Sequence, residues 1–151
     1  GMLPVSVVLA DDEVMLGIKP GEHGSTFGGN PLAAVVCMEA LEVVKHENLA
    51  ANADRLGAIF RQRIAELKQR SPLISAVRGK GLLNAIVVND TVDSSTAWDL
   101  CLQLMNEGLL AKPTHGNIIR LAPPLVITEE QLHECCDIIE RVFLSFAESR
   151  Q

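Results

Sequence analysis

The sequence predicts an α/β protein whose C-terminal part is an α+β domain, a mainly antiparallel sheet covered by helices. Short apolar runs rich in β-branched residues indicate strands, and stretches with apolar residues at helical spacing indicate helices between them. Hydrophobic residues make up 48% of the 151 residues, so the chain can bury one ordinary core. Aromatic residues make up only 3%, so this core must consist mainly of Leu, Ile, Val and Ala.

The first half of the chain is predicted to contain one strand, one loop and two helices. Residues 5–10 form an apolar, β-branched run that is typical of a buried strand. Residues 17–29 are dense in glycine and should form a long loop, a kind of loop that is usually functional. Asn30 and Pro31 favour the start of a helix. A break is expected at Asn48, and a second helix should stop at residues 71–72, a Ser-Pro pair.

A domain boundary is expected near residue 70, which separates residues 1–70 from residues 71–151. The second part reads as strand, strand, helix, strand, strand, helix. Its predicted strands lie in residues 74–88, around a Gly-Lys-Gly turn, and at 109–111 and 118–121. Its first helix should bury Trp98, Cys101, Leu102 and Met105.

The last helix carries the clearest local signals. Thr128 and Gln131 have the spacing of a capping box. The apolar face that follows repeats every 3.6 residues, and it consists of Leu132, Cys135, Cys136, Ile139, Val142, Phe143 and Phe146.

Charge and composition exclude several classes of function. The net charge of −6 argues against a nucleic-acid surface, which needs a basic stripe, and against an anionic membrane surface. No apolar run approaches the roughly 18 residues of a membrane span. The four cysteines have no metal-ligand spacing, so we expect small buried side chains in a reducing compartment and no metal site, with an incidental disulfide as the alternative.

Two stretches suggest binding sites. Residues 24–31 combine glycines, the hydroxyls of Ser25 and Thr26 and a helix start, which suits a phosphate, although a tight turn with a helix cap explains them too. Arg120 lies in an apolar strand and could bind a substrate carboxylate, or simply face solvent or a structural carboxylate. Lys80 and Lys112 are more simply surface residues than anion ligands.

Five segments match motifs of a known family: residues 19–31 (KPGEHGSTFGGNP), 47–50 (ENLA), 77–82 (VRGKGL), 108–116 (GLLAKPTHG) and 119–125 (IRLAPPL). Together they resemble the class-III, fold-type-I pyridoxal-phosphate-dependent aminotransferases, the group that includes ornithine, acetylornithine and 4-aminobutyrate aminotransferases. The AKPTHG stretch is most similar to the ornithine branch.

This resemblance implies a site shared between the two subunits of a homodimer. Thr26, with Ser25 beside it, would hold the phosphate of the cofactor in the neighbouring subunit. Arg120 would hold the substrate α-carboxylate. Residues 1–70 would be a remnant of the large cofactor-binding domain with its linker helices, and residues 71–151 the small domain.

The family's Schiff-base lysine has no counterpart in the chain, because none of its lysines lies in that motif: Lys19, Lys45, Lys68, Lys80 and Lys112. We therefore expect a C-terminal piece that is inactive alone, from an enzyme that transfers an amino group from ornithine to 2-oxoglutarate. The expected location is the cytoplasm, or the mitochondrial matrix for a eukaryotic parent. N-acetylornithine or 4-aminobutyrate as donor, and a non-catalytic module that self-associates or binds anions, are the alternatives.

Overall fold

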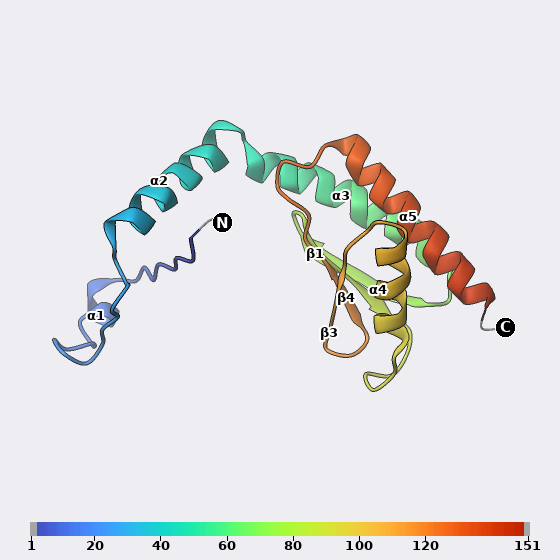
Figure 1. The fold of residues 1–151 in the computed structure, drawn as a ribbon, viewed down its shortest axis with the longest axis horizontal. Helices are drawn as coiled ribbons and strands as arrows, with labels where there is room; N and C mark the ends of the chain where they lie inside the picture. The colour runs from blue at the N-terminus through green and yellow to red at the C-terminus, as the bar shows by residue number, and fades with distance from the viewer. Residues whose placement is uncertain (1–2, 150–151) are drawn as a thin grey trace. The chain divides into compact units, whose positions relative to one another are not determined.

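The computed structural model describes residues 3–149 and divides into two compact units, Gly1–Glu47 and Asn48–Gln151 (Figure 1). The division falls at Asn48, whose backbone is left-handed with a φ of 51°, so the predicted helix break is confirmed. Helix α3 (Leu49–Lys68) packs on β1 (Ile74–Lys80) and α5 (Glu129–Glu148) and belongs to the second unit. The assignment of residues 1–70 to a larger cofactor-binding domain stays a prediction.

The first unit contains α1 (Asp12–Met15) and α2 (Pro31–His46). The strand predicted at residues 5–10 is wrong, since these residues are exposed and have no regular structure. A strand needs a neighbour for its backbone groups, and the described part of this unit contains no other strand. The long loop and the helix start are confirmed, with Asn30 Oδ1 accepting a hydrogen bond from Ala33 N at 2.9 Å.

The described part of the first unit has almost no core. Ala33 is its only buried residue, whereas Leu9 and Leu32 are 89% and 66% exposed. Along α2 the exposed apolar side chains also include Val35, Met38 and Leu41. Apolar surface of this extent is unusual on a monomer, which is the reason to expect self-association.

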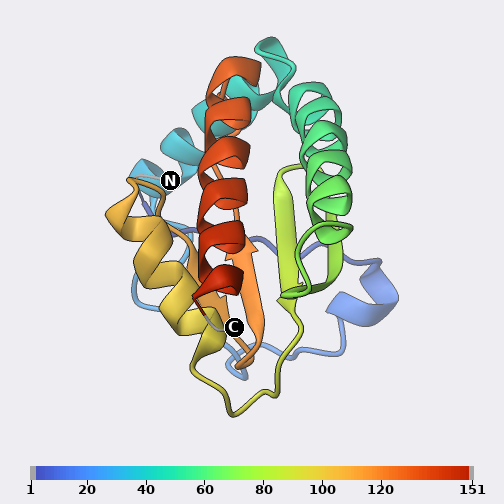
Figure 2. The same ribbon diagram turned by 90° about the vertical axis from the view of Figure 1, so that its right-hand side faces the viewer.

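The second unit contains a four-stranded antiparallel sheet, as predicted, in the order β1-β2-β4-β3. The strands are β1 (Ile74–Lys80), β2 (Leu83–Val88), β3 (Lys112–Thr114) and β4 (Ile118–Leu121). With α4 (Thr96–Asn106) and α5 (Glu129–Glu148), the predicted order of elements is confirmed. The three helices α3, α4 and α5 lie on the same side of the sheet (Figure 2, green, yellow and red).

Two local predictions in this unit are wrong by one to three residues. The third strand begins at Lys112 and not at Leu109, because Leu109 N still bonds to Leu104 O at 2.8 Å in the turn that ends α4. Helix α4 buries Ala97, Leu100, Cys101 and Leu104, while Trp98 and Met105 are 57% and 48% exposed.

The core of the second unit lies between the helices and the covered face of the sheet. Side chains that are at most 1% exposed come from every layer: Leu56 and Ile64 of α3, Ile86 and Val88 of β2, Leu100 and Leu104 of α4, Ile119 of β4, and Ile139 and Phe143 of α5. The capping box of Thr128 and Gln131 is present, and the predicted face of α5 is buried except for Cys135, which is half-buried.

Candidate functional site

Arg120 lies on the face of the sheet that the helices leave uncovered. Its strand neighbours Ile119 and Leu121 are 0% and 8% exposed and point into the core. Because successive side chains of a strand point to opposite faces, Arg120 points away from the core, and it is exposed. The apolar residues around Arg120 therefore fix the direction of its side chain.

The strand register places Arg120 in a row of basic residues. Arg78 lies opposite Ala85, Ala85 lies opposite Arg120, and Arg120 lies opposite Lys112. Directly opposite residues in antiparallel strands share a face. The open face thus carries three positive charges in one row, interrupted by the small side chain of Ala85.

None of these three cations has a partner among residues 3–149. The hydrogen bonds and ion pairs of that part of the chain include none from the side chains of Arg78, Lys112 or Arg120. By contrast, the described arginines of α3, of the turn after it and of α5 are all paired: Arg55 with Glu129, Arg61 with Gly81 O, Arg63 with Asp137, Arg70 with Glu140 and Arg141 with Glu107. Arg120 is thus not held by an internal carboxylate.

Two hollows flank Arg120. One, of about 360 Å³, has Arg78, Ala85 and Arg120 among its lining residues, together with Lys80 and His115. The other, of about 250 Å³, lies beside Lys112 and Arg120. No acidic side chain lines either hollow, so the open face is suited to an anion.

The hydroxyl loop lies in the other unit. Ser25 Oγ accepts a hydrogen bond from Gly28 N at 2.9 Å, so part of its bonding capacity is used locally. Thr26 is exposed and its side chain makes no hydrogen bond within residues 3–149. At the start of α2, Asn30 occupies the N–H of Ala33 and Pro31 has no N–H. An anion there would be bound mainly by the hydroxyls, and less by the helix than the sequence suggested.

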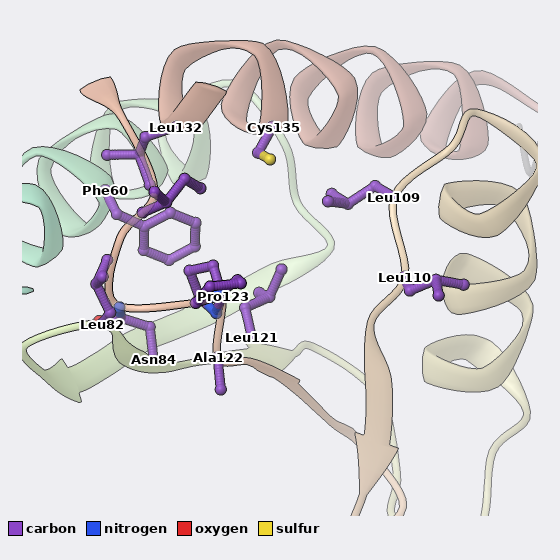
Figure 3. A pocket seen from close by; sticks show the side chains of 12 residues that line it. Phe60, Leu82, Asn84, Leu109, Leu110, Leu121, Ala122, Pro123, Leu132 and Cys135 are labelled. Atoms are coloured by element: carbon purple, nitrogen blue, oxygen red, sulfur yellow. The ribbon is translucent and has the colours of Figure 1, made fainter. Parts of the chain in front are cut away.

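An apolar pocket that the sequence did not predict lies between α3, α5 and the segment after β4 (Figure 3). Its volume is about 300 Å³, and Phe60, Leu109, Leu121 and Cys135 are among its lining residues. No charged side chain lines it. The pocket has no local signal in the sequence because its walls come from segments far apart in the chain.

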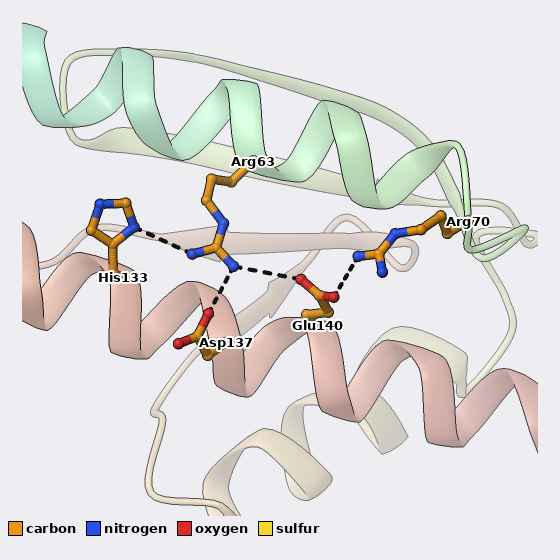
Figure 4. A network of polar contacts seen from close by, with 5 residues as sticks. All are labelled: Arg63, Arg70, His133, Asp137 and Glu140. Carbon is orange, nitrogen blue, oxygen red and sulfur yellow. Dashed lines mark hydrogen bonds and ion pairs between the residues drawn. The ribbon is translucent and has the colours of Figure 1, made fainter.

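A polar network joins α3 to α5 (Figure 4). Arg63 Nη2 lies 2.7 Å from Asp137 Oδ1 and 3.5 Å from Glu140 Oε2, and Arg70 bonds the other oxygen of Glu140. The hydrogen bond to Asp137 raises the pKa of Arg63. The network lies on the helical layer, away from the open face of the sheet, so we interpret it as structural.

The cysteines match the expectation of buried thiols in part. Cys101 and Cys136 are buried, and burial raises the pKa of each thiol to about 11. Cys37 and Cys135 are half-buried. The two buried thiols are therefore protonated and unreactive at neutral pH.

Within residues 3–149 no helix has the length and hydrophobicity to cross a bilayer. In that same range no three His, Cys, Asp or Glu side chains are grouped so that they could hold a metal ion.

Comparison with known proteins identifies the family. Residues 1–143 match the family described as aminotransferase class-III. The mitochondrial ornithine aminotransferase of Rattus norvegicus is 58% identical over 146 residues, which are 97% of this chain and 33% of that protein.

Solved structures give the same result. The acetylornithine aminotransferase of Elizabethkingia anophelis is 64% identical with a TM-score of 0.85, over 91% of this chain and 34% of that one. An ornithine delta-aminotransferase of Plasmodium falciparum is 50% identical with a TM-score of 0.86, over 93% of this chain and 36% of that one.

The chain thus spans about a third of the length of the relatives it matches. Within that third, the match extends over both units and includes the glycine-rich loop and the strand of Arg120. The chain therefore belongs to the class-III aminotransferase family.

Proposed function

We propose that the chain is part of a pyridoxal-phosphate-dependent ornithine aminotransferase, in which Arg120 binds the carboxylate of the amino acid and of the 2-oxo acid. The observation that carries this proposal is the exposed, unpaired guanidinium of Arg120 on a sheet face without acidic residues in its hollows. A guanidinium binds a carboxylate through two parallel hydrogen bonds. The sheet fixes the backbone position of Arg120 and the face from which its side chain extends.

Ornithine is the donor that we favour, and N-acetylornithine is the alternative. Relatives from rat, fruit fly and Plasmodium falciparum are named ornithine aminotransferases. The acetylornithine enzyme of Elizabethkingia anophelis, however, shares 64% of the aligned residues, more than the 58% of the rat protein. Side-by-side rates with the two donors, measured on an enzyme that contains this chain, decide between them.

The residues present fit the phosphate of the cofactor in part. The hydroxyls of Ser25 and Thr26 are exposed and can each donate a hydrogen bond. When bound, pyridoxal phosphate supplies an electron sink for chemistry at the substrate α-carbon. This chain's contribution would be to fix the phosphate with these hydroxyls and to orient the substrate with Arg120.

We propose that the 151-residue chain does not catalyse transamination alone, because none of its lysines lies in the family's cofactor-attachment motif. The test is an assay of the purified chain with pyridoxal phosphate, ornithine and 2-oxoglutarate. Formation of glutamate above the rate without protein would contradict this proposal.

The carboxylate role of Arg120 is tested by binding. Titration of the chain with 2-oxobutyrate, followed by calorimetry or NMR, should give an affinity that Arg120→Gln lowers roughly tenfold or more, because a charge-assisted bidentate bond is lost. Arg141→Gln removes the same charge from α5, far from the open face, and should leave the affinity unchanged. Equal affinities for Arg120→Gln and the unmodified chain would overturn the role.

A non-catalytic module that self-associates is the second candidate, and the apolar surface of the first unit favours it. In that case light scattering should show dimers or larger species whose formation weakens when Leu32 and Val35 of α2 are both replaced by Ser. A monodisperse monomer at all concentrations would count against it.

For the family function, we place the parent in the cytoplasm or, as the names of the rat and fruit-fly relatives suggest, in mitochondria.

A further inference from the structure

The apolar pocket between α3, α5 and the segment after β4 has no role in the proposed function. Leu121 of β4 lines the pocket and is buried, whereas Arg120, the residue before it, points to the open face of the sheet. All lining residues of the pocket belong to the second unit, so its shape does not depend on the other unit. Binding in the pocket is therefore a property separate from the role proposed for Arg120.

The pocket is a hollow within the packing of the second unit and not an exposed apolar face. Phe60 of α3, Leu121 of β4 and Leu132 of α5 line it, and each of these side chains is buried. Its volume of about 300 Å³ is at the lower end of the range of small-molecule sites, which is about 300–1,000 Å³. Since apolar cavities of about 150 Å³ already take up benzene, the pocket has room for a molecule with about two fused rings.

The chemistry of the lining favours a neutral ligand. Among the described residues that line the pocket, none has a charged side chain. The amide of Asn84 is already used within the protein, because Oδ1 accepts from Arg61 Nη1 at 2.9 Å and Nδ2 donates to Gly81 O at 3.1 Å. A charged or strongly polar ligand would lose its hydration and receive few hydrogen bonds in return.

Cys135 lines both this pocket and a neighbouring hollow of about 440 Å³. Glu134 is among the residues that line the neighbouring hollow, and its negative charge disfavours an anion close by. Figure 3 shows the thiol of Cys135 and the side chain of Leu132 extending from the same side of α5. Because the thiol is only half-buried, a ligand in the pocket would cover it further.

We propose that this pocket is a binding site for a small, neutral, mainly apolar molecule, with indole as a probe of suitable size and polarity. The ligand would pack among the side chains of Phe60, Leu109 and Leu132 and would shield Cys135 from solvent. Since it would contact α3, α5 and the segment after β4 only in the folded chain, its binding would also stabilise the second unit.

The first test is an NMR titration of the 151-residue chain with indole, compared with indole-3-acetate. Indole should bind with a Kd on the order of 0.1–1 mM and shift the backbone amide signals of lining residues such as Leu121 and Cys135. Indole-3-acetate has the same ring system with a carboxylate attached. At the same amides it should bind at least about tenfold more weakly, because the carboxylate would have to leave water.

Variants that fill the pocket locate the site. Leu109→Phe adds volume to a lining residue and should weaken the binding of indole by at least about fivefold. Leu102→Phe is the matched control, since it makes the same change at an exposed position of α4 outside the pocket, and the affinity should stay within about twofold. Cys135→Phe fills the pocket from α5 and serves as a second filling variant. Circular dichroism checks that each variant is folded.

The cysteines give an independent readout of the same site. Indole at twice its Kd should slow the alkylation of Cys135 by N-ethylmaleimide about threefold, because about two thirds of the pockets are then occupied. Cys37 is the internal control, since it is also half-buried but lies in α2 of the first unit, which carries exposed apolar side chains. Its alkylation rate, measured on the same sample by mass spectrometry of peptides, should not change.

Several results would overturn the proposal. One is the absence of shifts at the pocket amides at about 5 mM indole, and another is equal binding of indole and indole-3-acetate there. Equal affinities for indole in a folded filling variant and in Leu102→Phe would also overturn it. Equal slowing of Cys37 and Cys135 would show that indole only coats exposed apolar surface. Because Arg120 takes no part in these measurements, the proposed function is tested separately.

Discussion

Gly57 lies in the middle of α3, where alanine would normally stabilise a helix, and we predict that Gly57→Ala destabilises the second unit instead. In a helix interior, alanine is more favourable than glycine by about 1 kcal/mol of helix propensity. A Cβ at Gly57, however, would lie 1.8 Å from the carbonyl oxygen and 2.5 Å from the carbonyl carbon of Gly81. Helix α3 and the turn between β1 and β2 thus touch through a position that has no room for a methyl group.

The magnitude follows from the displacement that the methyl group demands. Ordinary contact distances are about 3.5 Å, so the helix and the turn must separate by roughly 1.5–2 Å. The carbonyl oxygen of Gly81 also accepts hydrogen bonds from Arg61 Nη1 at 3.0 Å and Asn84 Nδ2 at 3.1 Å. Overpacking typically costs about 1–3 kcal/mol, and strain on these bonds adds to it. We expect a net loss of about 1–3 kcal/mol after the helix preference is subtracted.

The assay is thermal unfolding followed by the fluorescence of Trp98, the single tryptophan of the chain, which reports on the second unit. For a domain of this size each kcal/mol lowers Tm by about 4–8 °C. Ala58→Gly, at the exposed neighbouring position of α3, is the matched control, and it should lose about 1 kcal/mol from helix preference alone. A Tm of Gly57→Ala equal to or above that of the unmodified chain, with the control behaving as stated, would refute the reasoning.

Three further predictions concern stability and reactivity. Thr128→Ala removes the oxygen that accepts from Gln131 N at 3.2 Å and should lower the free energy of unfolding by about 1 kcal/mol in urea titrations, whereas Thr128→Ser should not. The pKa of Glu129 is lowered, first by its hydrogen bond from Arg55, below the ordinary value of 4.5. The stabilisation is therefore present above that value and is lost as the pH falls through the lowered one, so Glu129→Gln should flatten the acid side of a plot of urea midpoint against pH; an unchanged slope would contradict this. Because burial raises the pKa of Cys101 and Cys136 to about 11, iodoacetamide at pH 8 should label both slowly in the folded chain and quickly in urea, as mass spectrometry of peptides can show. Labelling of both at the rate seen in urea would argue against their burial.

Features that depend on neighbouring residues were predictable from the sequence. The caps at Asn30 and Thr128 and the break at Asn48 follow from side chains within a few positions. The face of α5 followed from its long and regular apolar period. Helix α4 is shorter and apolar on several sides, so its buried face was assigned one position away from the true one.

Features that depend on distant residues were not predictable. Residues 5–10 have the composition of a strand, but a strand forms only where a partner edge exists, and the described part of their unit offers none. Arg120 could be singled out because a charge interrupts an apolar run. The row with Arg78 and Lys112 could not, because their alignment depends on which strands pair and in what register. The apolar pocket beside Cys135 was missed for the same reason.

The alternation of buried and exposed side chains along β4 ties the exposure of Arg120 to the packing of the core. If β4 slipped by one residue, Ile119 and Leu121 would come out into water and the guanidinium between them would enter the core. Burial of Ile119 and Leu121 therefore disfavours a shifted register of β4, and the correct register keeps Arg78, Arg120 and Lys112 in one row on the open face. The side chain at position 120 does not take part in this core packing, so it can be exchanged for another group while the fold of the sheet is kept.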